Sequence, residues 1–103
     1  MKTTNKNKDL TPQEAYTWLT QITPGCRNPD LEKVIATDAY WAYEYAYCVL
    51  KGRFELGEPI IAKDPELAFN YAVDKIKYRW KIAEPIILKS NYTNKYKNHF
   101  NIQ

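Results

Sequence analysis

The stretch 35–63, IATDAYWAYEYAYCVLKGRFELGEPIIAK, is matched along almost its whole length by the stretch 61–89, IAKDPELAFNYAVDKIKYRWKIAEPIILK. A step of 26 residues places Asp38 over Asp64 and Tyr45 over Tyr71. The same step aligns an arginine, a glutamate and a Pro-Ile-Ile group in the two stretches. We therefore predict a short tandem helical repeat in which each unit holds one long and one short helix.

An earlier and more degenerate copy precedes these two units. Arg27 and Glu32 fall one step before Arg53 and Glu58. Upstream of them the register slips by one residue near positions 23–25, and the match then continues back to the start of the first unit. About three units are therefore expected.

The length of 103 residues allows one domain with a single modest core. We expect an all-α fold, compact or slightly solenoidal, with its helical units in residues 11–89. Residues 1–10 are expected to form a flexible basic tail, and residues 90–103 a polar, basic C-terminal cap or tail.

Local signals place the ends of the long helices. Thr11-Pro12-Gln13-Glu14 and Asp64-Pro65-Glu66 each combine an N-cap residue, a proline in the first turn and an early acidic residue. A long helix is expected to begin at each of these sites. Gly52 is predicted to stop the middle helix, because glycine is the usual residue after a helix C-terminus.

Runs in the second unit carry a resemblance to a known repeat. AYEYA at 42–46, KGRF at 51–54 and EPIIAKDPE at 58–66 resemble the units of small phage and large-DNA-virus proteins, which read AYxYA, KGRW or KGRF, and EPxIAxDPE. The family has no settled biochemical activity. The resemblance implies a phage-encoded protein that acts in the cytoplasm of a bacterial host.

The recurring charged residues are interpreted as scaffold. One structural ion pair is predicted in each unit: Arg27 with Glu32, Arg53 with Glu58, and Arg79 with Glu84. The alternative is a charged binding strip along one edge. Recurrence favours the structural role, because stacked units need the same internal support.

Positions at which the units differ are the better candidates for binding a partner. Tyr40, Trp41 and Tyr47 are replaced one unit later by Glu, Leu and Val. With Tyr43, the two tyrosines have helical spacing and predict an aromatic stripe. Exposed, such a stripe would anchor a protein partner. Packing in the core or in a homo-oligomer interface are the alternatives.

The net charge of +3 is unevenly distributed. Between Leu10 and Leu88 the chain has nine basic and eleven acidic residues, so the body is not a basic nucleic-acid surface. The C-terminal segment mixes basic and aromatic residues, which can bind phosphate and stack on bases. Its nucleic-acid candidates are Lys95, Tyr96, Lys97 and Phe100. A solvated tail is the simpler interpretation.

Catalysis finds little support in the sequence. His99 is the only histidine and Ser90 the only serine, and neither a phosphate loop nor clustered metal ligands occur. We expect no enzyme activity, cofactor, metal site or membrane span, and no disulfide between Cys26 and Cys48.

Three hypotheses for function follow. The leading one is a protein-interaction module that binds a host protein and inhibits a bacterial defence system, such as a CRISPR nuclease. The second is binding of RNA or single-stranded DNA through the basic aromatic tails. The third is a structural protein that self-associates through the exposed ends of its repeat array.

Overall fold

The described residues, 10–22 and 27–102, contain seven α-helices and no strand in this computed structural model. The helices are α2 (Pro12–Thr17), α3 (Pro29–Ile35), α4 (Ala39–Glu44), α5 (Glu58–Ile61), α6 (Pro65–Tyr71), α7 (Glu84–Leu88) and α8 (Thr93–Phe100). Three of them continue into π-helical segments: α2 into Trp18–Ile22, α4 into Tyr45–Leu50 and α6 into Ala72–Ile76. A 3-10 turn, Glu55–Gly57, precedes α5. The predicted all-α class is confirmed.

Side chains in the sequence fix the start of each long helix. Thr11 and Glu14 form a reciprocal capping box at α2, in which each side chain bonds the backbone N–H of the other residue. Asp38 and Asp64 cap α4 and α6, and each carboxylate accepts a hydrogen bond from the third residue of its helix. These local signals give the helices of successive units the same starting geometry.

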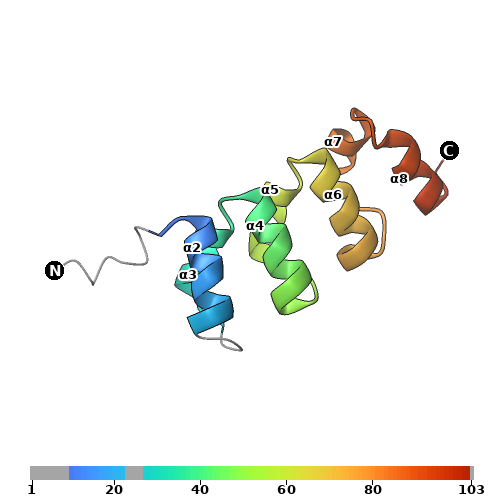
Figure 1. Cartoon of the computed structure of the whole chain (residues 1–103). Coiled ribbons are helices and arrows are strands. Elements are labelled where there is room, and N and C mark those ends of the chain that lie inside the picture. The colour runs from blue at the N-terminus through green and yellow to red at the C-terminus, as the bar shows by residue number, and fades with distance from the viewer. Residues whose placement is uncertain (1–9, 23–26, 103) are drawn as a thin grey trace.

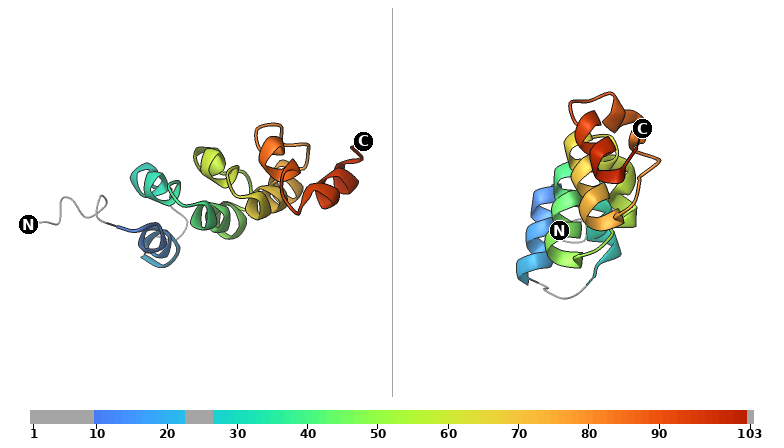
Figure 2. Two further views of the ribbon diagram at one scale, coloured as in Figure 1. Left: turned by 90° about the horizontal axis from the view of Figure 1, so that it is seen from above. Right: turned by 90° about the vertical axis from the view of Figure 1, so that its right-hand side faces the viewer.

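The helices form two layers. Figure 1 shows α2, α4, α6 and α8 side by side in chain order, and the view from above in Figure 2 shows α3, α5 and α7 as a second row behind them. The molecule extends over 57 × 23 × 16 Å. A long row of helices with one open face therefore runs along the molecule.

Small residues let the long helices approach one another closely. Ala15, Ala42 and Ala68 stand at corresponding places on α2, α4 and α6, and none has any exposed surface. The second isoleucine of each connector, as in Ile61 and Ile87, is fully buried between the layers. The core is thus a narrow strip between the two rows of helices.

The middle helix ends one residue before the expected position. Lys51 takes the left-handed conformation with φ 54°, and Lys77 does the same with φ 67° at the end of the next long helix. The prediction that Gly52 supplies this helix stop is wrong, because the turn closes on the preceding lysine. Tyr78 can therefore replace Gly52 one unit later without meeting a left-handed backbone.

The two ends of the chain differ in what the structure describes. Most of the predicted basic tail (residues 1–9), the register slip near 23–25 and Cys26 lie outside the described residues. At the other end the segment 90–103 contains α8, whose Tyr96 is fully buried. Within this segment, α8 is a helix packed against the preceding unit.

Candidate functional site

Each predicted ion pair is present, and each has the same geometry. In the second unit the Arg53 Nε and Nη2 atoms donate to the two carboxylate oxygens of Glu58, both at 2.8 Å. The matching Nε–Oε2 distances are 2.8 Å for Arg27–Glu32 and 2.7 Å for Arg79–Glu84. These are the bidentate contacts that a planar guanidinium makes with a carboxylate.

A tyrosine from the next long helix completes each pair. The Tyr71 hydroxyl donates to Glu58 Oε2 at 2.8 Å and accepts a hydrogen bond from the backbone N–H of Phe54 at 2.7 Å. Tyr45 likewise donates to Glu32. Tyr96 donates to Glu84 at 2.7 Å and accepts from the backbone of Trp80 at 2.8 Å. Each unit is therefore tied to the following one through a buried hydroxyl.

The electrostatics of these networks are those of internal support. Burial alone would raise the pKa of Glu58, but the hydrogen bonds from Arg53 and Tyr71 outweigh it and hold that pKa below its usual value. Burial and the neighbouring carboxylate raise the pKa of Tyr71 well above 10. A carboxylate kept ionised and a phenol kept protonated form a stable hydrogen-bonded pair, with no proton ready for transfer at neutral pH.

The residues that differ between units, Tyr40, Trp41 and Tyr47, form with Tyr43 a partly exposed aromatic strip on α4 and its extension. We define the aromatic strip as Tyr40, Trp41, Tyr43 and Tyr47. Tyr40 is 51% exposed and Tyr47 is 49% exposed, whereas Trp41 and Tyr43 are half-buried. The condition for a binding face, that Tyr40 and Tyr47 remain accessible, is met in the monomer.

Contacts between rings hold the strip in place. Tyr43 and Tyr47 stack with ring centroids 5.7 Å apart and an interplanar angle of 15°. Trp41 lies edge-on to Tyr40 at 4.8 Å and also packs against Tyr16 of α2 at 5.1 Å. Rings held in this way lose little further conformational freedom when a partner covers them.

Acidic groups border the same strip. Burial, followed by the charge of Asp74, raises the pKa of Tyr43 to about 12. Burial, a hydrogen bond with Cys48 and the charge of Glu44 raise the pKa of Tyr16 to about 12. These tyrosines therefore remain neutral phenols at physiological pH.

The C-terminal candidates for nucleic-acid binding do not form an exposed stacking surface. Tyr96 is buried with its hydroxyl bonded to Glu84, so the expectation that it stacks on a base is wrong. Phe100 packs against the Tyr96 ring, with centroids 4.9 Å apart. Lys95 is exposed but lies 5.6 Å from the ring centroid of Tyr92, and Lys97 is half-buried.

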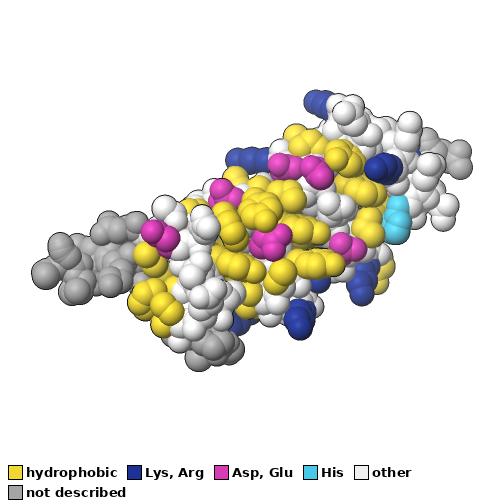
Figure 3. Space-filling model, viewed as in Figure 1, with side chains coloured by type: hydrophobic (Ala, Val, Ile, Leu, Met, Phe, Trp, Pro, Cys, Tyr) yellow, Lys and Arg dark blue, Asp and Glu magenta, His cyan; other side chains and the backbone are white. Residues whose placement is uncertain are grey.

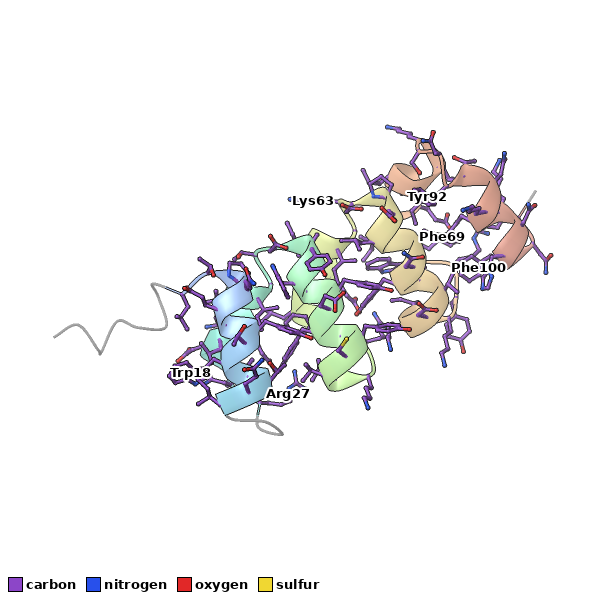
Figure 4. The ribbon with its side chains drawn as sticks, in the orientation of Figure 1. Trp18, Arg27, Lys63, Phe69, Tyr92 and Phe100 are labelled. Atoms are coloured by element: carbon purple, nitrogen blue, oxygen red, sulfur yellow. The ribbon has the colours of Figure 1, made fainter. Side chains whose placement is uncertain are left out.

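Figure 4 shows where these aromatic residues lie. The side chain of Phe69 on α6 lies on the side of that helix that faces α8. The rings of Phe69 and Tyr92 stack with centroids 5.8 Å apart. The aromatic residues of this end therefore join α8 to α6.

Sequence reasoning missed the hydroxyl half of the networks. Tyr45 and Tyr71 recur at the repeat step and are fully buried, but their hydrogen bonds to the preceding glutamates were not anticipated. A usable signal exists, because tyrosine follows the paired glutamate by 13 residues in the first two networks. The interval shortens to 12 residues between Glu84 and Tyr96, which hides the third tyrosine from an alignment at a constant step.

In the part of the chain that the structure describes, no three histidine, cysteine, aspartate or glutamate residues come together as metal ligands would. In the same residues, every buried side-chain nitrogen or oxygen has a hydrogen-bond partner. No described helix is long and apolar enough to cross a membrane.

Comparison of the chain with protein-family models, with curated proteins and with solved structures found no match. The choice of a functional surface therefore depends on the chain's own residues. By that criterion the aromatic strip is the leading candidate, since the ion-pair networks and the C-terminal aromatics are engaged within the fold.

Proposed function

We propose that this chain is a non-catalytic protein-interaction module that binds its partner through the aromatic strip of α4. The half-exposed Tyr40 and Tyr47 carry the proposal, because these large side chains stand where the units differ. Tyrosine and tryptophan are the residues most enriched among those that dominate binding energies. The partner would thus be selected by the part of the repeat that is unique to one unit.

The resemblance to phage repeats suggests a bacterial protein as the partner. On this proposal the chain acts by contact with a host protein, which it blocks or redirects. The pre-arranged rings fit that role, since a rigid surface binds with a smaller entropic cost than a flexible one. Inhibition of a defence nuclease is one form that such blocking would take.

A capture experiment with matched variants tests the proposal. The purified chain would be immobilised and exposed to nuclease-treated bacterial lysate, and retained proteins would be quantified by mass spectrometry. Tyr40→Gln/Tyr47→Gln should reduce recovery of the specific partner about tenfold or more, as expected when hot-spot residues are removed. Circular dichroism would confirm that the variant has the wild-type melting midpoint.

The control changes an apolar pair on the other layer that is at least as exposed as the two tyrosines. Leu56 is 49% exposed and Ile82 is 73% exposed, so Leu56→Gln/Ile82→Gln removes comparable apolar surface. This variant should retain the partner. Loss of recovery in the control, with full recovery in the tyrosine variant, would place the interface on the connectors and refute the assignment.

A further inference from the structure

The charges of the described helices are separated by layer. The three long segments with their caps, residues 12–22, 38–50 and 64–76, contain six acidic residues and one lysine, a formal net charge of −5. The connecting segments, residues 27–37, 51–63 and 77–89, contain nine basic and five acidic residues, a net charge of +4. The overall charge of +3 therefore hides two faces of opposite sign.

The acidic side chains lie along the same face as the aromatic strip. Figure 3 shows magenta carboxylates spaced along a band of hydrophobic side chains, whereas most of the blue basic groups lie at its borders. Glu14, Glu66 and Asp74 are exposed, and Glu44 is half-buried within the strip. Apart from Lys75, the lysines on the described helices of this row lie on α8, which carries Lys95 and Lys97.

The strip already binds one cation within the fold. The Lys75 Nζ atom lies 4.7 Å from the centroid of the Tyr47 ring, which is the arrangement of a cation–π contact. Lys75 is the single basic residue of the three long segments. The single lysine of these three segments is thus placed on the strip, beside the stacked Tyr43 and Tyr47.

We propose that the segment bound by this face is rich in arginine and lysine. The proposal rests on the protein-binding function above and specifies its partner's chemistry. Guanidinium and ammonium groups would lie over the exposed tyrosine rings and pair with Glu44 and Asp74, while their aliphatic stems cover the apolar surface. The charge of the three segments attracts such a partner and repels a nucleic acid.

The connector layer does not compete for a cationic partner. Its buried acids Glu32, Glu58 and Glu84 are each paired with an arginine and a tyrosine of the chain itself. The exposed acids that remain there, Asp30 and Glu55, are outnumbered by lysines. A basic segment is therefore directed to one side of the molecule.

A peptide titration tests this chemistry directly. The probe is a fluorescein-labelled peptide of alternating arginine and alanine, and its counterpart has glutamate in place of every arginine. Fluorescence anisotropy should detect saturable binding of the arginine peptide, weakened by added NaCl, and none of the glutamate peptide. Amide chemical shifts should change mainly in residues 38–48 and 66–75.

Matched charge reversals decide where the peptide binds. Glu44→Lys/Asp74→Lys should weaken binding about tenfold, whereas Glu55→Lys/Asp30→Lys, with the same change in net charge, should change it less than about twofold. Equal losses in the two variants, or shifts spread over the connectors, would show attraction by net charge alone and overturn the proposal. Each variant's melting midpoint would be measured first.

Two outcomes separate this inference from the function on which it rests. If Tyr40→Gln/Tyr47→Gln abolishes partner capture while Glu44→Lys/Asp74→Lys does not weaken it, the strip binds a protein but the cationic chemistry is wrong. Sedimentation velocity tests a second copy of the chain as the occupant. Self-association that Glu44→Lys/Asp74→Lys removes would assign the acidic face to the chain's own basic layer and refute the separate partner.

Discussion

A single hydroxyl group joins two units at each ion-pair network. The Tyr71 oxygen lies between the Glu58 carboxylate and the backbone N–H of Phe54, and all three groups are buried. Because each of these groups has given up water, its hydrogen bonds must come from the protein. The phenol satisfies a donor and an acceptor that no neighbouring apolar side chain can satisfy.

Removal of that oxygen should therefore be costly. Tyr71→Phe leaves the Phe54 N–H without its partner and removes one hydrogen bond from Glu58, a loss of roughly 1–3 kcal/mol of unfolding free energy. For a domain of this size each kcal/mol lowers the melting midpoint by about 4–8 °C. Thermal unfolding followed by circular dichroism measures the effect. The control is Tyr47→Phe, which removes an exposed phenol and should have the same melting midpoint as the wild type. Equal midpoints for all three proteins would show that the Tyr71 hydroxyl does not stabilise the fold.

Alanine substitutions at the two glycines of the second connector should change the unfolding free energy in opposite directions. A Cβ atom at Gly57 would lie 2.8 Å from the Ala42 Cβ and 2.7 Å from the Phe54 ring, so Gly57→Ala should cost roughly 1–3 kcal/mol by overpacking. At Gly52 the nearest atom is the Leu50 carbonyl oxygen at 3.8 Å. Gly52→Ala should be neutral or stabilising, by up to about 1 kcal/mol, through the unfolded chain. Urea denaturation measures the unfolding free energy of both variants. If Gly57→Ala is as stable as the wild type, α4 and the connector must move apart enough to admit the extra methyl group.

At the scale of elements, the residues at the ends of the long helices suit their backbone conformation less well than the capping residues at the starts. Lys77 has φ 67°, and its N–H donates to the Ala72 carbonyl at 2.6 Å as the long helix closes. A residue with a Cβ is strained in this conformation, whereas glycine adopts it freely. The sequence thus places a lysine where the backbone favours glycine.

Lys77→Gly should consequently raise stability by roughly 0.5–1 kcal/mol, seen as a higher denaturation midpoint at unchanged denaturant sensitivity. The contrasting substitution is Lys33→Gly, inside the helical turns of α3, which should lower stability by about 1 kcal/mol. If both glycine variants are destabilised equally, the left-handed residue that follows the α6 extension is not a point of strain.

The elements also show which features are readable from sequence. The starts of α2 and α6 were predictable, because the side chains of Thr11 and Asp64 each accept from a backbone N–H three residues away. The helix stop at Gly52 was predicted wrongly. Where the last, widened turn closes depends on how the helix packs, and the left-handed residue falls on Lys51. Local chemistry decides a helix start more completely than it decides a helix end.

The same contrast applies to the candidate site. The arginine–glutamate pairs were predictable because both partners recur at one step, five residues apart. Tyr96 was misassigned to a nucleic-acid surface because one residue fewer separates it from its glutamate than in the other networks. The exposure of Tyr40 and Tyr47 depends on which face of α4 the neighbouring helices cover. Sequence spacing defined the stripe but left that face undecided.

At the scale of the whole molecule, the three networks lie one after another along the row of helices. Each links an arginine and a glutamate of one unit to a tyrosine of the next: Arg27, Glu32 and Tyr45; Arg53, Glu58 and Tyr71; Arg79, Glu84 and Tyr96. In a molecule 57 Å long and 16 Å thick, each unit contacts mainly its neighbours in the row, and these networks join neighbouring units through buried hydrogen bonds. The cohesion of the array should therefore follow the protonation state of these groups.

Stability should fall on both sides of neutral pH. The folded pKa values of Glu32, Glu58 and Glu84 lie below the ordinary 4.5, so the stability they contribute is complete above that pH and is lost as acid protonates the folded carboxylates. The tyrosines act in the opposite direction. Tyr96, for example, has its pKa raised from 10 to about 12, so its contribution is complete below pH 10 and is lost as the pH rises toward 12.

Urea unfolding at pH 3, 7 and 11 should give the highest midpoint at pH 7. Between pH 7 and 11 the midpoint of Tyr71→Phe should fall by less than that of the wild type. A midpoint that is constant from pH 7 to 11 would mean that the buried phenols ionise as readily in the folded chain as in the unfolded one, and that the networks do not hold the units together.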